Sequence, residues 1–159
     1  MKKILIIIVI TIFLSGCTQP TIIKLDTNNG NKNSDTSIKI NSLKKVYKDC
    51  DFYIKGVCHE ETTPENDYFL IVDLIIEHKG PESILINGYD FSLLDEDGKE
   101  FDKIRLDENI SSYLIGSVLP NDKLKGQIAF DVKDMNKFVL RRTEEPLKSF
   151  SINKKDIVE

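Results

Sequence analysis

Two long segments of the chain alternate apolar and polar residues, and this period of two constrains the fold more than any other feature. In YFLIVDLIIEH, residues 68–78, the even positions from 70 to 76 are apolar while the odd ones include Asp73 and Glu77. In KLKGQIAFDV, residues 123–132, the even positions are again apolar except for Gly126. Because successive side chains of a strand point to opposite faces, both segments are predicted to be β-strands with one face in a core.

Shorter segments of the same character lie between turn signals along the rest of the chain. No stretch has a strong helical period, so the chain is predicted to be all-β, an antiparallel β-sandwich of short strands. We interpret DENISSYLIGSVLP, residues 107–120, as a loop with a helical turn packed by Tyr113, Leu114 and Ile115. The shorter predicted strands are Ser37–Asn41, Phe52–Val57, Ile84–Ile86, Tyr89–Leu94, Lys99–Ile104, Lys137–Arg142 and Lys148–Asn153.

The hairpin LLDEDGKEF decides one strand register, because its Asp-Gly pair is the strongest turn signal in the chain. A two-residue turn would place Phe101 opposite Leu94, whereas a three-residue loop with Gly98 in the left-handed conformation places it opposite Leu93. We favour the second, since it puts Phe101 on the same face as Phe91 and Leu93. The registers together predict a core of Leu70, Val72, Leu74, Ile76, Phe91, Leu93, Phe101, Leu124, Ile128, Phe130 and Val132.

The same hairpin has a functional alternative, a calcium loop suggested by Asp95, Asp97 and Gly98. An EF-hand loop needs an acidic ligand where Leu93 stands, and it needs helical flanks that this sequence lacks. The structural interpretation of the hairpin is therefore favoured.

The N-terminus combines a charged start, an apolar run and small residues. Lys2 and Lys3 precede Ile4–Leu14, an apolar run of eleven residues interrupted only by Thr11. A helix that crosses a bilayer needs about 20 apolar residues, so this run is too short for a permanent span. Residues 1–16 are predicted to be a secretory signal peptide.

The block LSGC, residues 14–17, resembles the lipobox of bacterial lipoproteins, in which the cysteine thiol is alkylated by a diacylglyceryl group and the preceding peptide bond is cut. The resemblance implies that Cys17 becomes the lipidated first residue of the mature chain. An ordinary secreted protein with an incidental cysteine is the alternative. Two or more acyl chains anchor a protein stably, so we expect an extracytoplasmic protein attached to the cell membrane.

The mature chain, residues 17–159, is long enough for one domain with a sizeable core. DTNNGNKNSDT, residues 26–36, has no aliphatic or aromatic side chain and is predicted to be a flexible spacer with a reach of roughly 20 Å. We therefore expect a lipidated spacer over 17–36, a β-sandwich over 37–153 and a polar tail over 154–159. Without the signal peptide, 20 basic and 26 acidic residues leave a net charge of −6, which argues against a nucleic-acid partner.

Three blocks resemble successive parts of the domain-of-unknown-function family 4352: NDYFLIVDLIIEHKGPES, FSLLDEDGKEF and LPNDKLKGQIAFDV. Members of this family are commonly lipoproteins or secreted proteins of bacteria and archaea with an immunoglobulin-like β-sandwich. The resemblance covers roughly residues 37–153 and implies a fold and a location, because the family has no established common activity. One departure is His78-Lys79-Gly80, where such families tend to carry Asn before the turn.

Two cysteines remain besides Cys17. In an extracytoplasmic compartment Cys50 and Cys58 are predicted to form a disulfide. The alternative is a metal site made by these cysteines and His59, with Glu60 or Glu61 as further ligands. The seven residues between the cysteines do not match the close spacing of zinc ligands, so we favour the disulfide and expect no metal and no cofactor.

The chain offers little for catalysis. Its two histidines are His59 and His78, and no serine lies in a Gly-x-Ser-x-Gly elbow. The acidic stretches at 65–68 and 105–109 are interpreted as solvated loops. We therefore expect no enzyme but a surface-tethered module that contacts a protein or envelope component. A carrier of a small molecule or ion is the alternative, followed by a hydrolase that uses His78 or a metal near His59.

Overall fold

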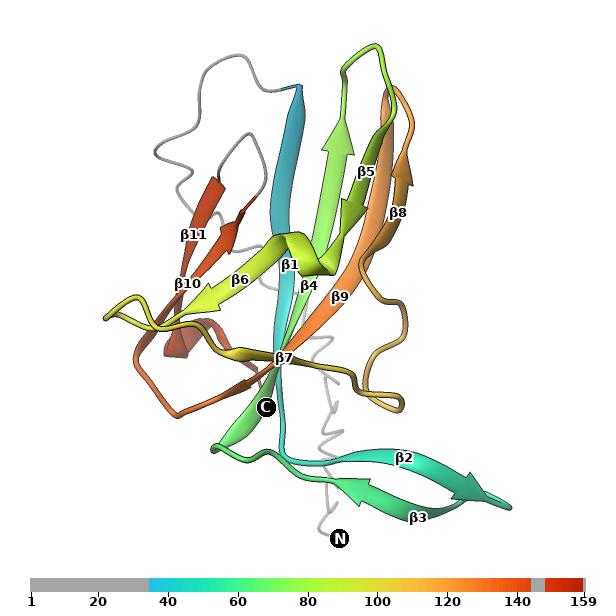
Figure 1. Cartoon of the computed structure of the whole chain (residues 1–159), viewed down its shortest axis with the longest axis vertical. Helices are drawn as coiled ribbons and strands as arrows, with labels where there is room; N and C mark the ends of the chain where they lie inside the picture. Colours follow the sequence, from blue (N-terminus) through green and yellow to red (C-terminus); the bar gives the residue numbers. More distant parts are fainter. Residues whose placement is uncertain (1–34, 144–147, 159) are drawn as a thin grey trace, which may run out of the picture.

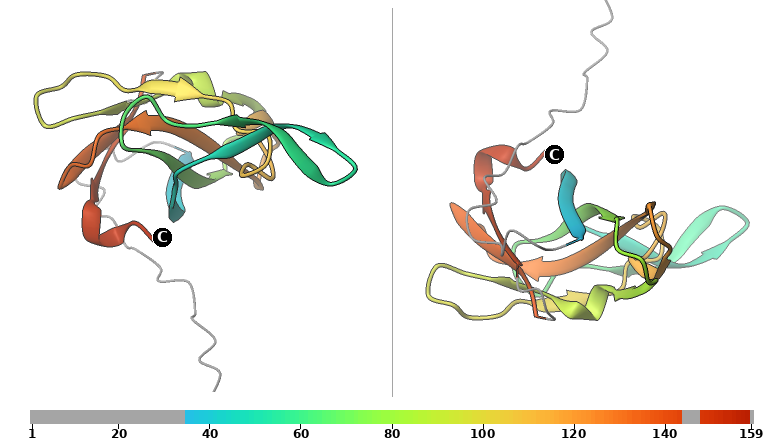
Figure 2. Two further views of the ribbon diagram at one scale, coloured as in Figure 1. Left: turned by 90° about the horizontal axis from the view of Figure 1, so that it is seen from below. Right: turned by 90° about the horizontal axis from the view of Figure 1, so that it is seen from above.

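Two antiparallel sheets face each other in the computed structural model, which describes residues 35–143 and 148–158 (Figures 1 and 2). The signal peptide, Cys17 and most of the expected spacer lie outside the described residues. The first sheet has the order β1 (Thr36–Val46), β4 (Tyr68–His78), β9 (Asp122–Val132), β7 (Asp102–Ile104). The second has the order β11 (Lys148–Asn153), β10 (Lys137–Arg142), β6 (Phe91–Leu94).

Two further pairs of strands complete the fold, which is an immunoglobulin-like antiparallel β-sandwich. A hairpin of β2 and β3 projects from one end of the sandwich, and a ribbon of β5 and β8 lies beside the first sheet near the other end (Figure 1). Two short 3-10 helices, η1 and η2, follow β5 and β11. The bounds are β2 (Asp49–Ile54), β3 (Val57–Thr62), β5 (Ile84–Asn87), β8 (Ile115–Val118), η1 (Gly88–Asp90) and η2 (Lys154–Asp156).

The predicted core is confirmed in full. Nine of its eleven residues are buried between the two sheets, and Phe101 and Leu124 pack against them partly buried. The three-residue loop is also confirmed, since Leu94 pairs with Glu100, the Phe101 amide donates to the Leu93 carbonyl at 2.9 Å, and Gly98 has φ +83°. Local alternation and turn chemistry therefore encode the centre of the sandwich correctly.

Several strand boundaries differ from the prediction. The single strand Phe52–Val57 is wrong, because Lys55 and Gly56 both have positive φ and turn the chain into the β2–β3 hairpin. The helical turn predicted within 107–120 is also wrong, since β8 occupies part of that segment. Among its three packing residues, only Leu114 is buried.

A second, smaller apolar cluster lies on the outer face of the first sheet. Phe69 and Ile71 belong to it although they occupy the odd positions of β4, where alternation predicts exposure. They are buried because the chain after β7 folds back across them and contributes Leu106 and Ile110. This crossing segment, residues 105–115, forms one wall of the site described below.

The C-terminal residues lie against the first sheet rather than apart from it. Val158 bridges to Lys44 of β1 in parallel, and its amide donates to the Leu43 carbonyl at 3.1 Å. The segment expected as a polar tail therefore contacts β1. Within the described residues, no helix is long and apolar enough to cross a membrane.

Candidate functional site

A cavity of about 350 Å³ lies beside β9 at the edge of the sandwich. On one side of β9, residues 129–131 pair with β7, whereas Gln127 pairs with Tyr113. The cavity lies between these two pairing partners. Its walls come from four separate segments of the chain. The lining residues are Asn87, Gly88, Tyr89, Lys103, Ile104, Arg105, Tyr113, Leu114, Ile115, Gln127, Ile128 and Ala129.

One wall is the turn at η1, which its own polar groups hold in place. The Asn87 side chain accepts a hydrogen bond from the Tyr89 amide at 3.1 Å, and the Asn87 amide donates to the Asp90 carboxylate at 3.0 Å. The Gly88 amide donates to the Leu114 carbonyl at 2.6 Å and so ties this wall to the opposite one. Tyr89 itself extends into solvent and is 79% exposed.

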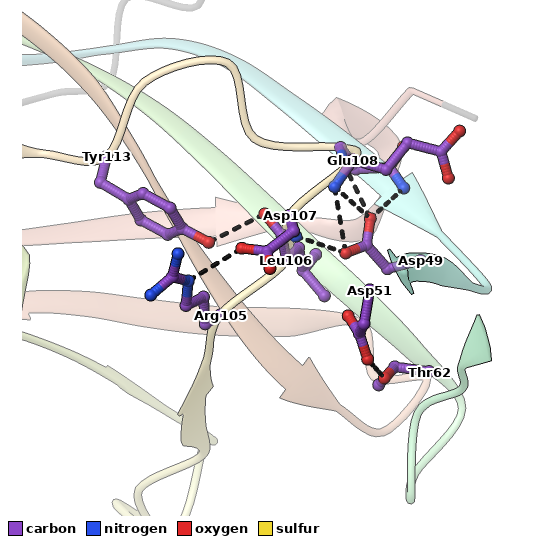
Figure 3. Close-up of polar contacts among 9 residues, drawn as sticks. Asp49, Asp51, Thr62, Arg105, Leu106, Asp107, Glu108 and Tyr113 are labelled. Carbon is purple, nitrogen blue, oxygen red and sulfur yellow. Dashed lines mark hydrogen bonds and ion pairs between the residues drawn. The ribbon is translucent and has the colours of Figure 1, made fainter. Parts of the chain in front are cut away.

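The opposite wall, residues 105–115, is anchored by one buried carboxylate. Asp49, at the start of β2, accepts hydrogen bonds from the amides of Asp107 at 2.5 Å, Glu108 at 3.2 Å and Asn109 at 2.9 Å (Figure 3). The Asn109 side chain adds a fourth donor at 2.7 Å. Successive amides of a turn converge on one side and suit an anion, so Asp49 fixes the shape of a segment that has little regular structure.

The β2–β3 hairpin contributes a second contact to the same segment. Tyr53 donates a hydrogen bond to Glu108, and this bond, with the nearby acidic groups, raises the pKa of Tyr53 to about 12. The phenol is therefore neutral at physiological pH and remains a donor.

Tyr113 presents a fixed aromatic ring to the cavity. Its hydroxyl donates to the Leu106 carbonyl at 2.8 Å, and the Arg105 guanidinium lies 5.8 Å from the ring centroid (Figure 3). Burial raises the pKa of the Tyr113 phenol. Arg105 is oriented in turn by Asp107, whose carboxylate accepts from its Nε at 2.8 Å. These contacts hold an aromatic ring and a cation side by side at the cavity wall.

Gly126 allows this wall to approach β9. A Cβ atom at position 126 would lie 2.5 Å from the Leu114 Cα and 2.8 Å from its amide nitrogen. No side chain fits in that space, so the glycine on the inner face of β9 permits the contact with Leu114.

The charge of the cavity differs from the charge of the chain. Lys103 and Arg105 are both in its lining, whereas none of the described residues that line it is Asp or Glu. Lys103 contacts Glu100 at 3.5 Å and Arg105 contacts Asp107 at 2.8 Å, and both carboxylates lie outside the lining. A cationic cavity thus lies on a chain whose net charge is −4.

Large apolar side chains are exposed next to the cavity. On the β5–β8 ribbon Leu85 pairs with Ser117, and Ile115 pairs with Asn87. Leu85 is 71% exposed and Ile115 is 63% exposed. With Tyr89 they form an exposed apolar group, which we call the rim: Leu85, Tyr89 and Ile115.

The predicted cysteine pair has the favoured arrangement. Cys50 and Cys58 are joined by a disulfide in the structure, with their Cα atoms 5.9 Å apart. Both sulfur atoms of the alternative metal site are therefore engaged, and His59 is exposed. The described residues contain no group of three or more His, Cys, Asp or Glu side chains placed to hold a metal ion.

His78 holds a turn. Its Nδ1 lies 3.0 Å from the Thr36 hydroxyl and its Nε2 lies 2.7 Å from the Glu82 carbonyl, so the ring accepts from one and donates to the other. A Cβ at Gly80 would lie 2.6 Å from the ring, which explains the glycine beneath it. The departure from the family pattern at His78 thus preserves a side-chain cap of the turn.

Other carboxylates that the sequence offered for chemistry also bind backbone amides. Asp95 Oδ1 accepts from the amides of Asp97 and Lys99 at 2.9 and 2.8 Å and so shapes the hairpin. The buried Asp131 binds the amides of Glu65 and Asn66 at 2.7 and 3.1 Å. The acidic stretches at 65–68 and 105–109 are therefore fastened by Asp131 and Asp49, rather than being free solvated loops.

Sequence reasoning missed the cavity residues Tyr89, Lys103 and Arg105, and it treated Tyr113 only as a packing residue. No local motif contains them, because they come from separate segments that meet only in the folded chain. One weak signal was present: the chain has few arginines, and Arg105 is one of three.

Comparisons with known proteins agree with this architecture. A model of the family "Domain of unknown function (DUF4352)" matches residues 25–148, and a model of the prokaryotic membrane lipoprotein lipid attachment site matches residues 1–18. Among curated proteins, none matches the chain.

Two solved structures from Bacillus subtilis are similar. The candidate lipoprotein ycdA has 19% sequence identity and a TM-score of 0.62 over 82% of this chain, which spans 39% of that protein. The yjhA protein has 16% identity and a TM-score of 0.52 over 72% of this chain and 77% of that one. At such low identity the likeness shows the fold alone.

Proposed function

Because the chain belongs to the family of the domain of unknown function DUF4352 and is a lipid-anchored extracytoplasmic lipoprotein, we propose that it is a non-enzymatic interaction module. Cys17 is the lipidated residue in this proposal, and the cavity with its rim is the surface that binds an envelope component. The lipoprotein attachment site supports the tether. The geometry of the cavity supports the binding surface.

The observation that carries the proposal is the combination of a braced cavity with exposed apolar side chains. Grouped apolar side chains at a surface are typical of binding sites, and the rim places Leu85, Tyr89 and Ile115 in solvent. The walls are braced from both sides by Asp49 and by the bond between Gly88 and Leu114. A site formed before binding loses less conformational entropy when a ligand arrives.

The position of the cavity also suits a tethered module. The described chain enters the first sheet at Thr36, which pairs with His78 at one end of β4. Gln127 in the cavity wall pairs with Asp73, five residues along β4 and so about 17 Å from that end. The predicted spacer adds further reach. The cavity therefore stands away from the point where the tether joins the domain.

The engagement of His78 supports the non-enzymatic part of the proposal. A general base needs a ring nitrogen that is available to a substrate. Both nitrogens of His78 contact groups of this chain, and the residue is buried. The hydrolase alternative that relies on His78 is therefore disfavoured.

The experiment is site-specific photo-cross-linking in intact cells. A photoreactive amino acid replaces Leu85 at the rim or, as the matched control, Val57 next to the turn of the β2–β3 hairpin; both side chains are exposed. We expect one dominant cross-linked product from position 85, identified by mass spectrometry, and we expect Tyr89→Ala and Cys17→Ser to abolish it. Equal products from both positions, or no product from position 85, would contradict the proposal.

A further inference from the structure

We propose that the cavity binds an anionic sugar ring, that is, a saccharide unit that carries a carboxylate or a phosphate. The inference rests on the proposed function and names the ligand class of the same site. Three features of the cavity support it: its size, its aromatic and amide lining, and its local charge.

The size of the cavity suits a single substituted ring. Ligand sites in proteins typically have volumes of roughly 300–1,000 Å³, and this cavity, at about 350 Å³, lies near the lower limit. A large cofactor does not fit. One unit of an envelope polymer can enter while its neighbours remain outside against the rim.

The lining offers the two kinds of contact that a sugar ring needs. Tyr89 and Tyr113 contribute aromatic surface, on which the apolar C–H face of a sugar ring can pack. Asn87 and Gln127 contribute amide groups that can bond to ring hydroxyls. Tyr113 is held by its bond to the Leu106 carbonyl, so its ring is already positioned before a ligand binds.

The two cations select for negative charge. Lys103 and Arg105 are two positions apart on one chain segment that enters the cavity wall, and their acidic partners, Glu100 and Asp107, lie outside the lining. The Nε–H of Arg105 bonds to Asp107, and a further donor of Arg105 bonds to Tyr113, so the other Nη donors remain for a ligand. A guanidinium binds carboxylate and phosphate oxygens in pairs, so either anion fits this wall.

The negative charge of the rest of the protein restricts anion binding to the cavity. The mature chain carries a net charge of −6, and such a surface repels small anions in general. An anion therefore binds where two cations and no acid are in the lining itself, which is the condition in the cavity. Attraction to the protein as a whole does not explain it.

The test is a titration of the lipidated protein in detergent micelles, followed by amide NMR spectra. The probes are D-glucuronate and D-glucose 6-phosphate, with D-glucose as the neutral counterpart and inorganic phosphate as the anion without a ring. We expect both anionic sugars to shift the amides of Gly88, Leu114 and Ile128 saturably. Glucose and phosphate alone are expected to bind at least tenfold more weakly. The tighter of the two anionic sugars identifies the source as a uronic acid or a sugar phosphate.

Variants separate the roles of charge and ring. Lys103→Gln with Arg105→Gln is expected to weaken both anionic sugars at least tenfold and to leave glucose unchanged, whereas Arg141→Gln, at an exposed arginine of β10, changes nothing. Tyr89→Ala is expected to weaken all three sugars.

Two results would overturn the inference. The first is glucose binding as tightly as the anionic sugars, and the second is the absence of saturable shifts at the cavity. Neither result affects the cross-linking from position 85, which tests the proposed function separately.

Discussion

The core between the two sheets and the segment 105–115 are both well packed, but different interactions hold them. The core is fixed by many apolar side chains that recur at every second position of several strands. The segment has little regular pairing. Beyond its two buried side chains, Leu106 and Ile110, it is held by polar contacts, chiefly the four hydrogen bonds to Asp49, and by the close approach at Gly126. Alternating apolar residues are therefore sufficient to form the β-sandwich core of this protein, whereas individual polar residues determine the shape of its cavity.

The two regions should also differ in how well they tolerate amino-acid substitutions. A core of alternating residues tolerates change because its neighbours share the burial. The amides that converge on Asp49 depend on that one carboxylate, since they lose their acceptor together when it is removed. Substitutions in the two regions should therefore act differently, on global stability in the core and on the cavity in the segment.

The largest loss of stability is expected for Phe130→Ala in the core. Phe130 is fully buried between the sheets, and removal of a buried phenylalanine side chain costs about 3–5 kcal/mol. Urea unfolding would measure the change, with Lys125→Ala at an exposed position of the same strand as the control. A near-neutral result for Phe130→Ala would mean that the core is not packed as described.

Asp49→Ala tests the anchor of the segment. We expect a loss of roughly 3 kcal/mol, because several amides with limited access to water lose a charged acceptor. The matched control is Asp51→Ala on the same strand, where an exposed carboxylate accepts from Thr62 and the expected change is within about 0.5 kcal/mol. NMR spectra should also show shifts at the cavity amides for Asp49→Ala alone. Equal stability of the two variants would show that the Asp49 carboxylate does not anchor segment 105–115.

Removal of the disulfide tests how much the covalent link between β2 and β3 contributes to stability. By the chain-entropy model, Cys58→Ser should lower the free energy of unfolding by on the order of 2–3 kcal/mol. Mass spectrometry of the native protein, with and without reduction before alkylation, would determine whether Cys50 and Cys58 are paired in cells. Full alkylation without a reductant would contradict the pairing.

Gly126→Ala places a methyl group against the backbone of Leu114. Overpacking of this kind typically costs about 1–3 kcal/mol, and the wall of the cavity must move to relieve the contact at 2.5 Å. Thermal unfolding would measure the loss, and ligand titration would measure the change at the cavity. Unchanged values in both would show that the wall is not held by this approach.

Tyr68→Phe should have the smallest effect at neutral pH. The Tyr68 hydroxyl is buried and has no hydrogen-bond partner within the described part of the chain, so its removal from the core leaves no group unsatisfied. Burial, followed by the charge of Asp134, raises the pKa of Tyr68 to about 12.

The dependence on pH follows from that shift. The phenol of the unfolded chain ionises near pH 10, whereas the folded protein keeps it neutral to about pH 12. The stability that Tyr68 contributes is therefore present below pH 10 and is lost as the pH rises from 10 to 12. Urea midpoints at pH 8 and pH 11 should differ less for Tyr68→Phe than for the wild type. Tyr89→Phe, at an exposed tyrosine, is the control and should behave as the wild type does.

Much of the frame could be predicted because its causes are local. The inward faces of β4 and β9 follow from alternation, and the register of Leu93 with Phe101 follows from the Asp-Gly turn. The β2–β3 hairpin could not be predicted with the same rules, since Lys55-Gly56 is a weaker turn signal than Asn-Gly or Asp-Gly. The buried odd positions of β4, Phe69 and Ile71, were missed because their cover comes from a distant segment.

The lipoprotein motif, the alternation of apolar residues and the turn residues were enough to predict that this protein is lipid-anchored, that it is a β-sandwich and which side chains fill its centre. Those properties depend on neighbours in the chain and on a period of two. The cavity, in contrast, forms only in the folded chain, because its walls come from separate segments and Asp49, which anchors one wall, is 58 residues from Asp107. A local sequence pattern cannot predict a contact between residues so far apart, because that contact forms only after the strands have paired.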